Sequence, residues 1–212
     1  MSRTSKPPQD RRNEFIQAAR DLFNEKGFEK TSIDDIVARL GVAKGLFYYY
    51  FDSKEEVLDI LYERLQDEIE SAVTGAMERK GLNAIERMAE LLAAKRDVTC
   101  RSSTIMAYFK KERNKALQLS MEKRALDFMT EAMQEIIVQG VEEGVFDTKY
   151  PRQTAIAILS MAHGLGNALP ETRTVEEMRE YYQVLVFLAE RVLGMKPGSF
   201  VVNDRLLPPG VV

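Results

Sequence analysis

Lysine, glycine and three consecutive tyrosines occur together in the short segment KGLFYYY, residues 44–50. On a helix, residues four apart share a face, so Lys44 lies next to Tyr48 and Gly45 next to Tyr49. A lysine ammonium can reach a guanine edge or a phosphate, and phenol hydroxyls can donate to phosphate oxygens. Gly45 has no Cβ to hold the backbone away from the bases. The spacing therefore predicts a helix that contacts the major groove of DNA.

The remaining face of the same segment is apolar. Ala43, Phe47 and Phe51 recur every four residues and form a stripe that we expect to be buried, while Leu46 and Tyr50 lie beside the polar stripes. Each polar residue also has a simpler explanation, because adjacent tyrosines are often half-buried core or interface residues and a single lysine is often a solvated surface residue. The combination with two nearby glycines favours a DNA-reading helix.

A second helix is expected immediately before this segment. Ser32 is a suitable N-cap, and Asp35 three residues later forms an imperfect capping box, for which Glu or Gln is the better partner. Gly41 stands just past the helix, where a left-handed residue is favoured. The apolar face consists of Ile33, Ile36, Val37 and Leu40. Two short helices joined by such a turn describe a helix-turn-helix at about residues 32–51.

This stretch resembles the signature of TetR-type (tetracycline-repressor-like) transcriptional regulators. The resemblance is dense and colinear over roughly residues 9–69, and the rest of the chain agrees only in length, helical content and a few landmarks. Ala43 stands where many members have Ser or Thr, and Leu46 where a smaller residue is common. The segments that carry the resemblance are Thr31-Ser32-Ile33, Leu40 to Gly45, Phe47 to Phe51 and Ser53 to Glu56.

The resemblance implies a sequence-specific DNA-binding regulator, in most cases a repressor that a small effector releases from its operator. It places Phe47 in the core. The alternative is a helical binding or enzymatic module in which the helix-turn-helix is only structural, and such a module would show no saturable, sequence-specific DNA binding. By the resemblance, the DNA contacts fall on Thr31, Ser32, Lys44, Gly45, Leu46, Tyr48, Tyr49, Tyr50 and Lys54.

Length, composition and charge fit a modest globular regulator. The 212 residues are 45% hydrophobic and 30% charged, and no apolar run approaches the ~20 residues of a membrane span. No apolar segment follows the basic N-terminus as in a secretory signal, and the single cysteine forms no intrachain disulfide, so the expected location is the cytoplasm. The net charge of −3 predicts weak non-specific binding to DNA, with affinity concentrated in a fitted interface.

The sequence offers little for catalysis or metal binding. It has one histidine, His163, and one cysteine, Cys100, whereas a structural zinc site needs four ligands. No glycine-rich phosphate loop or nucleophile elbow occurs. A catalytic pair of Cys100 and His163 is conceivable, but an inert buried cysteine is the commoner case. We therefore expect no enzyme activity, no metal and no cofactor.

The hydrophobic periodicity is helical throughout, which predicts an all-α fold. A three-helix DNA-binding lobe at 9–69 is expected to join a helical ligand-binding and dimerisation bundle at 70–194, followed by an irregular tail at 195–212. A full capping box, Ser53 to Glu56, should open a long connecting helix that ends near Gly81. A polar break is expected at 97–103. The later helices are expected at 83–96, 105–109, 116–141 (ended by Gly140, Gly144 and Asp147), 151–169 and 174–194.

The larger lobe is expected to bind both a second subunit and an effector. A single short recognition helix reads few base pairs, so we expect a homodimer on a pseudo-palindromic double-stranded operator. The dimer should form through helices 151–169 and 174–194, because these are apolar on more than one face. Methionines and aromatics predict a pocket for a small hydrophobic effector, although methionine is also ordinary core filler and His163 a common core residue. The candidate pocket residues are Met88, Leu92, Met106, Phe109, Met129, Met133 and His163.

Overall fold

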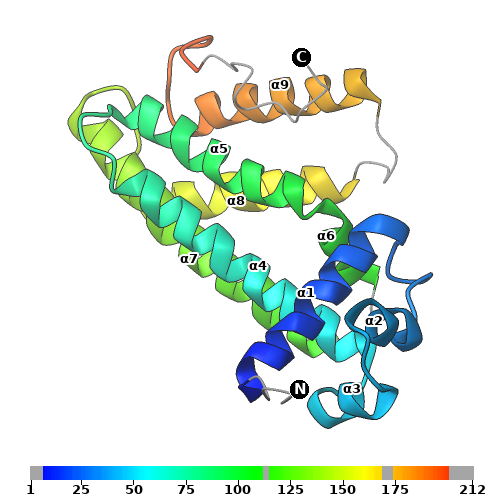
Figure 1. The fold of residues 1–212 in the computed structure, drawn as a ribbon. Coiled ribbons are helices and arrows are strands. Elements are labelled where there is room, and N and C mark those ends of the chain that lie inside the picture. Colours follow the sequence, from blue (N-terminus) through cyan, green and yellow to red (C-terminus); the bar gives the residue numbers. More distant parts are fainter. Residues whose placement is uncertain (1–6, 112–114, 169–173, 201–212) are drawn as a thin grey trace. The chain divides into compact units, whose positions relative to one another are not determined.

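Helices form all the regular secondary structure in the part of the chain that the computed structural model describes, residues 7–111, 115–168 and 174–200. This confirms the predicted all-α fold (Figure 1). None of these helices is long and apolar enough to cross a membrane. The helices are α1 (Pro8–Lys26), α2 (Ile33–Leu40), α3 (Lys44–Tyr50), α4 (Lys54–Met77), α5 (Ala84–Arg101), α6 (Ser103–Lys111), α7 (Lys115–Glu142), α8 (Pro151–Ala168) and α9 (Val175–Val192).

The chain divides into two compact units, and α4 contributes residues to both. The first unit contains the described residues up to Asp67 together with 101–118, and the second contains Glu68–Cys100 and the described residues from Leu119 onward. The first boundary lies close to residue 69, where the sequence places the end of the DNA-binding lobe. The assignment of α6 differs from expectation, because this helix belongs to the first unit and not to the larger bundle.

Aromatic packing explains why α6 joins the first unit. The Tyr108 ring lies 5.6 Å from the ring of Phe28, and the Phe109 ring stacks on Tyr62 of α4 with centroids 3.5 Å apart and an interplanar angle of 4°. Phe28 and Phe109 are both buried. Large buried rings dominate the energetics of small cores. The sequence pattern alone identifies Phe109 as apolar but does not reveal which aromatic residues it meets.

The polar break expected at 97–103 is much shorter in the structure, because α5 continues to Arg101. Val98 is buried and lies seven residues after the buried Leu91, so the apolar face of the helix persists through this segment. Its polar residues are satisfied locally, since Arg96 pairs with Asp97 and the Thr99 hydroxyl donates to the Lys95 carbonyl at 3.1 Å. Most of this polar segment therefore belongs to a helix and not to a loop.

The end of α7 also differs from expectation, because Gly140 lies inside the helix. It is buried, and a Cβ built there would lie 2.0 Å from Cδ2 of Phe146. The chain turns instead at Gly144, with φ +72°, and the backbone N–H groups of Val145 and Phe146 donate to the Gly140 carbonyl. Gly140 therefore makes room for the Phe146 ring, which folds back over the last turn of the helix.

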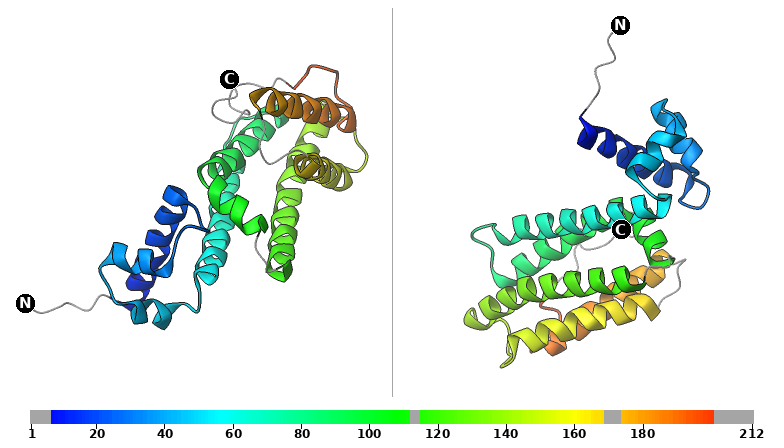
Figure 2. Two further views of the ribbon diagram at one scale, coloured as in Figure 1. Left: turned by 90° about the vertical axis from the view of Figure 1, so that its right-hand side faces the viewer. Right: turned by 90° about the horizontal axis from the view of Figure 1, so that it is seen from below.

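The second unit ends in α8 and α9, which pack against each other (Figures 1 and 2). Thr174 and Glu177 form the predicted capping box of α9, whereas the predicted end of the preceding helix at Leu169 lies outside the described residues. Buried Glu190 accepts the backbone N–H groups of Phe200 at 2.9 Å and Gly198 at 3.0 Å, and these bonds lower the pKa of its carboxyl. One carboxylate thus orders the start of the tail, while residues 201–212 lie outside the described part.

We predict that Gly140→Ala destabilises the protein although alanine is the better helix former. The new Cβ must displace the Phe146 ring, and overpacking of this kind costs about 1–3 kcal/mol. Gly75→Ala is the matched control, because Gly75 is an exposed residue of α4 and a Cβ added to it would have no heavy atom within 4 Å. It should raise stability by up to about 1 kcal/mol. Denaturant unfolding of both variants measures the difference, and equal shifts would contradict the role of Gly140.

Candidate nucleic-acid interface

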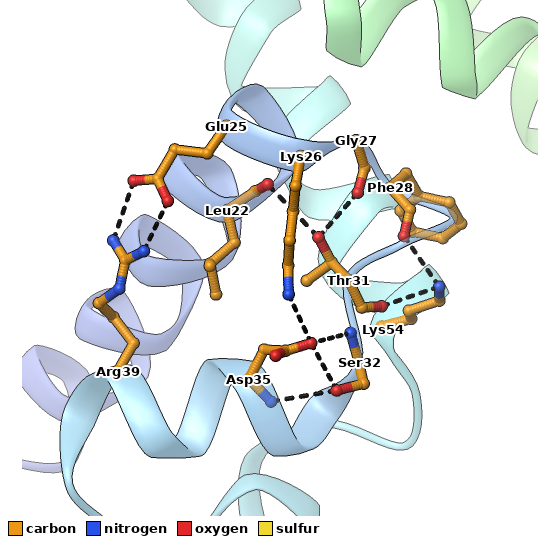
Figure 3. Close-up of polar contacts among 10 residues, drawn as sticks. All are labelled: Leu22, Glu25, Lys26, Gly27, Phe28, Thr31, Ser32, Asp35, Arg39 and Lys54. Atoms are coloured by element: carbon orange, nitrogen blue, oxygen red, sulfur yellow. Dashed lines mark hydrogen bonds and ion pairs between the residues drawn. The ribbon is translucent and has the colours of Figure 1, made fainter.

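The N-terminus of α2 is fixed by the capping box that the sequence predicts. Ser32 Oγ accepts the Asp35 N–H at 3.1 Å, and Asp35 Oδ2 accepts the Ser32 N–H at 2.8 Å (Figure 3). Lys26 Nζ, from the end of α1, lies 2.8 Å from the same carboxylate oxygen. The Lys26 ammonium and then the Ser32 hydroxyl and N–H hold the pKa of Asp35 well below its usual range. The cap therefore also ties α2 to α1.

A second ion pair joins α1 and α2 at the other end of α2. The Arg39 guanidinium donates to both carboxylate oxygens of Glu25, at 3.0 and 2.6 Å (Figure 3). The pair is exposed and contributes little to stability, but its two-bond geometry restricts the rotation of α2 on α1. The turn that follows is confirmed as predicted, with Gly41 in the left-handed conformation at φ 64° and ψ 37°. The Val42 N–H donates to the Val37 carbonyl and closes the turn.

Helix α3 is held on the lobe by Phe47 and Phe51 of its apolar stripe, whereas Ala43, which was expected to be buried with them, is exposed at the N-cap. Phe47 is fully buried, with its ring 5.8 Å from Phe15 and 5.3 Å from Phe51. The opposite face projects outward, since Tyr48 is 52% and Tyr49 74% exposed. Tyr50 is half-buried and its ring lies 5.9 Å from Phe15, so it belongs partly to the core. Burial of one face thus sets which side chains the helix presents to solvent.

Gly45 is exposed on α3, and the fold does not require a glycine there. Its φ is not positive, and a Cβ at this position would have no heavy atom within 4 Å. Alanine would favour the helix by up to about 1 kcal/mol. The missing side chain therefore leaves space outside the protein surface. Close approach of a ligand to the backbone is the use of glycine that fits this position.

Lys44 has an intramolecular partner at the start of α3. Its Nζ lies 2.9 Å from Asp34 Oδ2, and both side chains are exposed, at 48% and 68%. The hydrogen bond to Asp34 raises the pKa of Lys44, so the lysine is fully charged at neutral pH. An exposed pair of this kind opens at little cost. Lys44 can therefore exchange the carboxylate for another anion.

DNA contacts are expected for Thr31 and Lys54, but the side chains of both form hydrogen bonds within the lobe. Thr31 is 1% exposed and its hydroxyl donates to the Gly27 carbonyl at 2.7 Å. Lys54 Nζ donates to the carbonyls of Phe28 at 3.0 Å and Thr31 at 3.1 Å, and it lies 4.2 Å above the Phe28 ring (Figure 3). These side chains hold the loop between α1 and α2 against the start of α4.

The capping box expected at the start of α4 forms with one change. Ser53 Oγ accepts the Glu56 N–H at 3.1 Å as predicted. The Glu56 carboxylate, however, accepts the N–H of Asp52 at 2.7 Å, one residue before the expected donor. Both bonds bring the start of α4 close to the end of α3. The N-terminus of α4 is therefore positioned by residues on both sides of the turn.

An open depression of about 490 Å³ joins the starts of α2, α3 and α4. It brings together five of the expected contact residues and adds Lys30, which sequence reasoning missed. The five are Thr31, Ser32, Lys44, Tyr48 and Lys54. The only sequence signal for Lys30 is its position two residues before the N-cap Ser32. Three lysines and four acidic residues line the surface, so its charge is mixed. The lining residues are Glu29 to Asp34, Lys44, Tyr48 and Asp52 to Glu55.

The residues expected to bind an effector are divided between the two units. Met106 and Phe109 lie on α6 in the first unit, and the other five lie in the second. Three of these five are buried, Met88 on α5 with Met129 and Met133 on α7, and Leu92 is half-buried. His163 is exposed on α8, where its Nε2 lies 2.8 Å from Asn167 Nδ2. The structure thus places His163 on the surface of the single chain.

We predict that Lys54→Met destabilises the first unit. Methionine keeps the apolar stem but loses the two bonds to carbonyls and the cation over Phe28, which together are worth about 1–3 kcal/mol. Lys30→Met is the control, because Lys30 is exposed and has no ion-pair partner among the described residues. Thermal unfolding should show a lower midpoint for the first variant only. An unchanged midpoint for Lys54→Met would show that its bonds are dispensable.

Comparison with known proteins agrees with this geometry. Residues 15–60 match the family of bacterial regulatory proteins of the tetR type. The HTH-type transcriptional regulator YfiR of Bacillus subtilis is 28% identical over 169 residues, which cover 77% of this chain and 82% of YfiR. The HTH-type transcriptional repressor KstR2 of Mycobacterium tuberculosis is 28% identical over 160 residues, 69% of this chain and 74% of that protein.

A solved structure extends the similarity to nearly the whole chain. The crystal structure of a transcriptional regulator of the TetR/AcrR family from Thermobifida fusca is 29% identical, with a TM-score of 0.65, and the match covers 90% of this chain and 98% of that one. The matched segment includes the helix-turn-helix described above, and the wider match includes the helical second unit. Residues 15–60 therefore carry the DNA-binding domain of the TetR family, and the chain is similar over most of its length to transcriptional regulators of that family.

Proposed function

We propose that this regulator is a homodimeric repressor that binds a pseudo-palindromic operator and releases it when a small effector binds the second unit. The observation that carries the proposal is the geometry of α3. A fully buried Phe47 anchors the helix, while Lys44, Gly45, Tyr48 and Tyr49 face outward. A rigid helix that presents a cation, two phenols and bare backbone is suited to the major groove.

The outward residues take different parts in the proposed interface. Lys44 would exchange Asp34 for a phosphate or a guanine edge, and Tyr48 and Tyr49 would donate to phosphate oxygens. Ser32, Leu46 and Tyr50 lie at the margin of the same surface. Thr31 and Lys54 would act indirectly, because their side chains hold the loop that carries Ser32. This reduces the expected set of direct contacts to Ser32, Lys44, Gly45, Leu46, Tyr48, Tyr49 and Tyr50.

Dimerisation is proposed through α8 and α9. A C2 dimer presents two copies of α3 to two half-sites, one or more helical turns apart on DNA. Large apolar side chains are exposed on both helices, including Ile156 at 39%, Val184 at 39% and Phe187 at 53%. The Arg191 guanidinium lies over the Phe187 ring, with Cζ 5.4 Å from the ring centroid. Exposed apolar residues on neighbouring helices are typical of a surface that another protein covers.

Release by an effector would use α4 as the connection. This helix is continuous and has residues in both units, so a shift of its second part would move its first part as well. The separation of the two α3 helices in the dimer would then change, and with it their fit to successive major grooves. An effector can drive this change only through different affinities for the two dimer shapes.

We predict that Tyr48→Ala and Lys44→Ala each weaken operator binding by about 1–3 kcal/mol without changing thermal stability. Phe47→Ala should instead unfold the lobe more easily, by about 3–5 kcal/mol, because it leaves a cavity beside Phe15 and Phe51. Shift assays at several salt concentrations with DNA upstream of the gene, together with unfolding curves, separate the two effects. If wild-type protein shows no saturable, sequence-specific binding, the helix-turn-helix is only structural.

We predict that Phe187→Asp and Ile156→Asp convert the dimer into a folded monomer. A carboxylate buried in an apolar interface should raise the dissociation constant about a hundredfold or more. Val138→Asp on α7 is the control, since Val138 is 38% exposed but lies outside α8 and α9. Analytical ultracentrifugation at micromolar concentration measures the change. A monomeric wild-type protein, or a monomer produced equally by the control, would overturn the proposed interface.

A further inference from the structure

Lys95 occupies the centre of the inward face of α5. The buried residues of this helix are Ala84, Met88, Leu91 and Val98, which recur at spacings of three, four and seven. Lys95 follows Leu91 by four residues and precedes Val98 by three, so it continues the same stripe. It is half-buried, whereas a lysine on the solvent face of a helix would be exposed. A cation therefore interrupts an otherwise apolar stripe in the second unit.

The ammonium of Lys95 has no acceptor among the described residues, which distinguishes it from its neighbour. Arg96 is also half-buried, but it pairs with the exposed Asp97. Burial lowers the pKa of Lys95, and no neighbouring carboxylate counteracts this effect. An unpaired cation that is partly removed from water costs free energy unless an anion approaches it. A structural ion pair would have supplied that anion from the chain itself.

The residues of α5 that share the stripe with Lys95 are apolar and buried. Only Glu86, Asp97 and Arg101 of this helix are exposed, so most of its circumference is covered. Met88 and Leu91 precede Lys95 on the stripe and Val98 follows it, and all three are buried. Methionine side chains can rearrange around an apolar guest at low cost. The stripe therefore offers one positive charge with apolar contacts on both sides of it.

We propose that Lys95 anchors the carboxylate of the effector, an apolar molecule that carries one such group, with its hydrocarbon part lying along Met88 and Leu91. The proposal rests on the proposed ligand-responsive function and makes the ligand class more specific. A charge-assisted hydrogen bond to the carboxylate would satisfy the ammonium that the fold leaves unpaired. Because the stripe carries one cation, the proposed effector carries one anionic group. The apolar residues around it disfavour a ligand charged along its length.

Calorimetry with octanoate and 1-octanol tests the charge requirement, because the two probes share a chain length and differ in the anionic head. Wild-type protein should bind octanoate about tenfold or more tightly than octanol. Lys95→Met keeps the length of the side chain and should lose this preference while retaining octanol binding. Lys123→Met, at an exposed position of α7, is the control and should behave like wild type.

Three outcomes would overturn the assignment: octanol bound as tightly as octanoate, an unchanged preference in Lys95→Met, or no binding of either probe. Thermal unfolding of Lys95→Met without probe should show an equal or higher midpoint, which excludes misfolding as the cause of lost binding. The operator shift assay separates this proposal from the proposed function. If octanoate binds through Lys95 but the operator is not released, the result contradicts ligand-driven release and leaves the role of Lys95 intact. If a neutral effector releases the operator, the result contradicts the role of Lys95 and leaves ligand-driven release intact.

Discussion

A helix of seven residues contains too few hydrogen bonds to persist by itself in water, so α3 depends on the burial of Phe47. The ring of Phe47 packs against Phe15 of α1 and Phe51 at the end of α3. This aromatic packing stabilises a helix that is too short to be stable by its own hydrogen bonds. The same burial determines which face of α3 is presented to solvent. One face of this short helix thus stabilises the fold, and the opposite face presents the residues that can contact DNA.

Local signals in the sequence were sufficient at most places where the relevant interaction spans four residues or fewer. The Ser32 cap, the left-handed Gly41 and the Thr174 capping box are of this kind, and the structure confirms each. In the stripe of α3, Phe47 and Phe51 are buried as predicted, but Ala43 is exposed. At the start of α4, the carboxylate of Glu56 selects the N–H of Asp52, so even a local motif left the exact donor open.

Interactions between residues far apart in the chain were not predictable in this way. Glu25 and Arg39 are fourteen residues apart, and Lys54 bonds to carbonyls twenty-three and twenty-six residues before it. The family resemblance placed Lys54 among the DNA contacts, but its side chain donates to two loop carbonyls. Lys95 is a related case, because a lysine in a helical pattern is normally assigned to the solvent face. Only the burial of Leu91 and Val98 on either side reveals its position.

The pairing of Lys44 with Asp34 has a kinetic consequence for a protein that must find one site on a long DNA molecule. A phosphate of random DNA can displace the Asp34 carboxylate from Lys44 at little cost, but without a fitted surface it gains little, because one ion pair only replaces another. The chain as a whole carries a charge of −3, which further weakens such encounters. Dwell times on wrong sequences would be short, and the time needed to scan the genome would be correspondingly reduced.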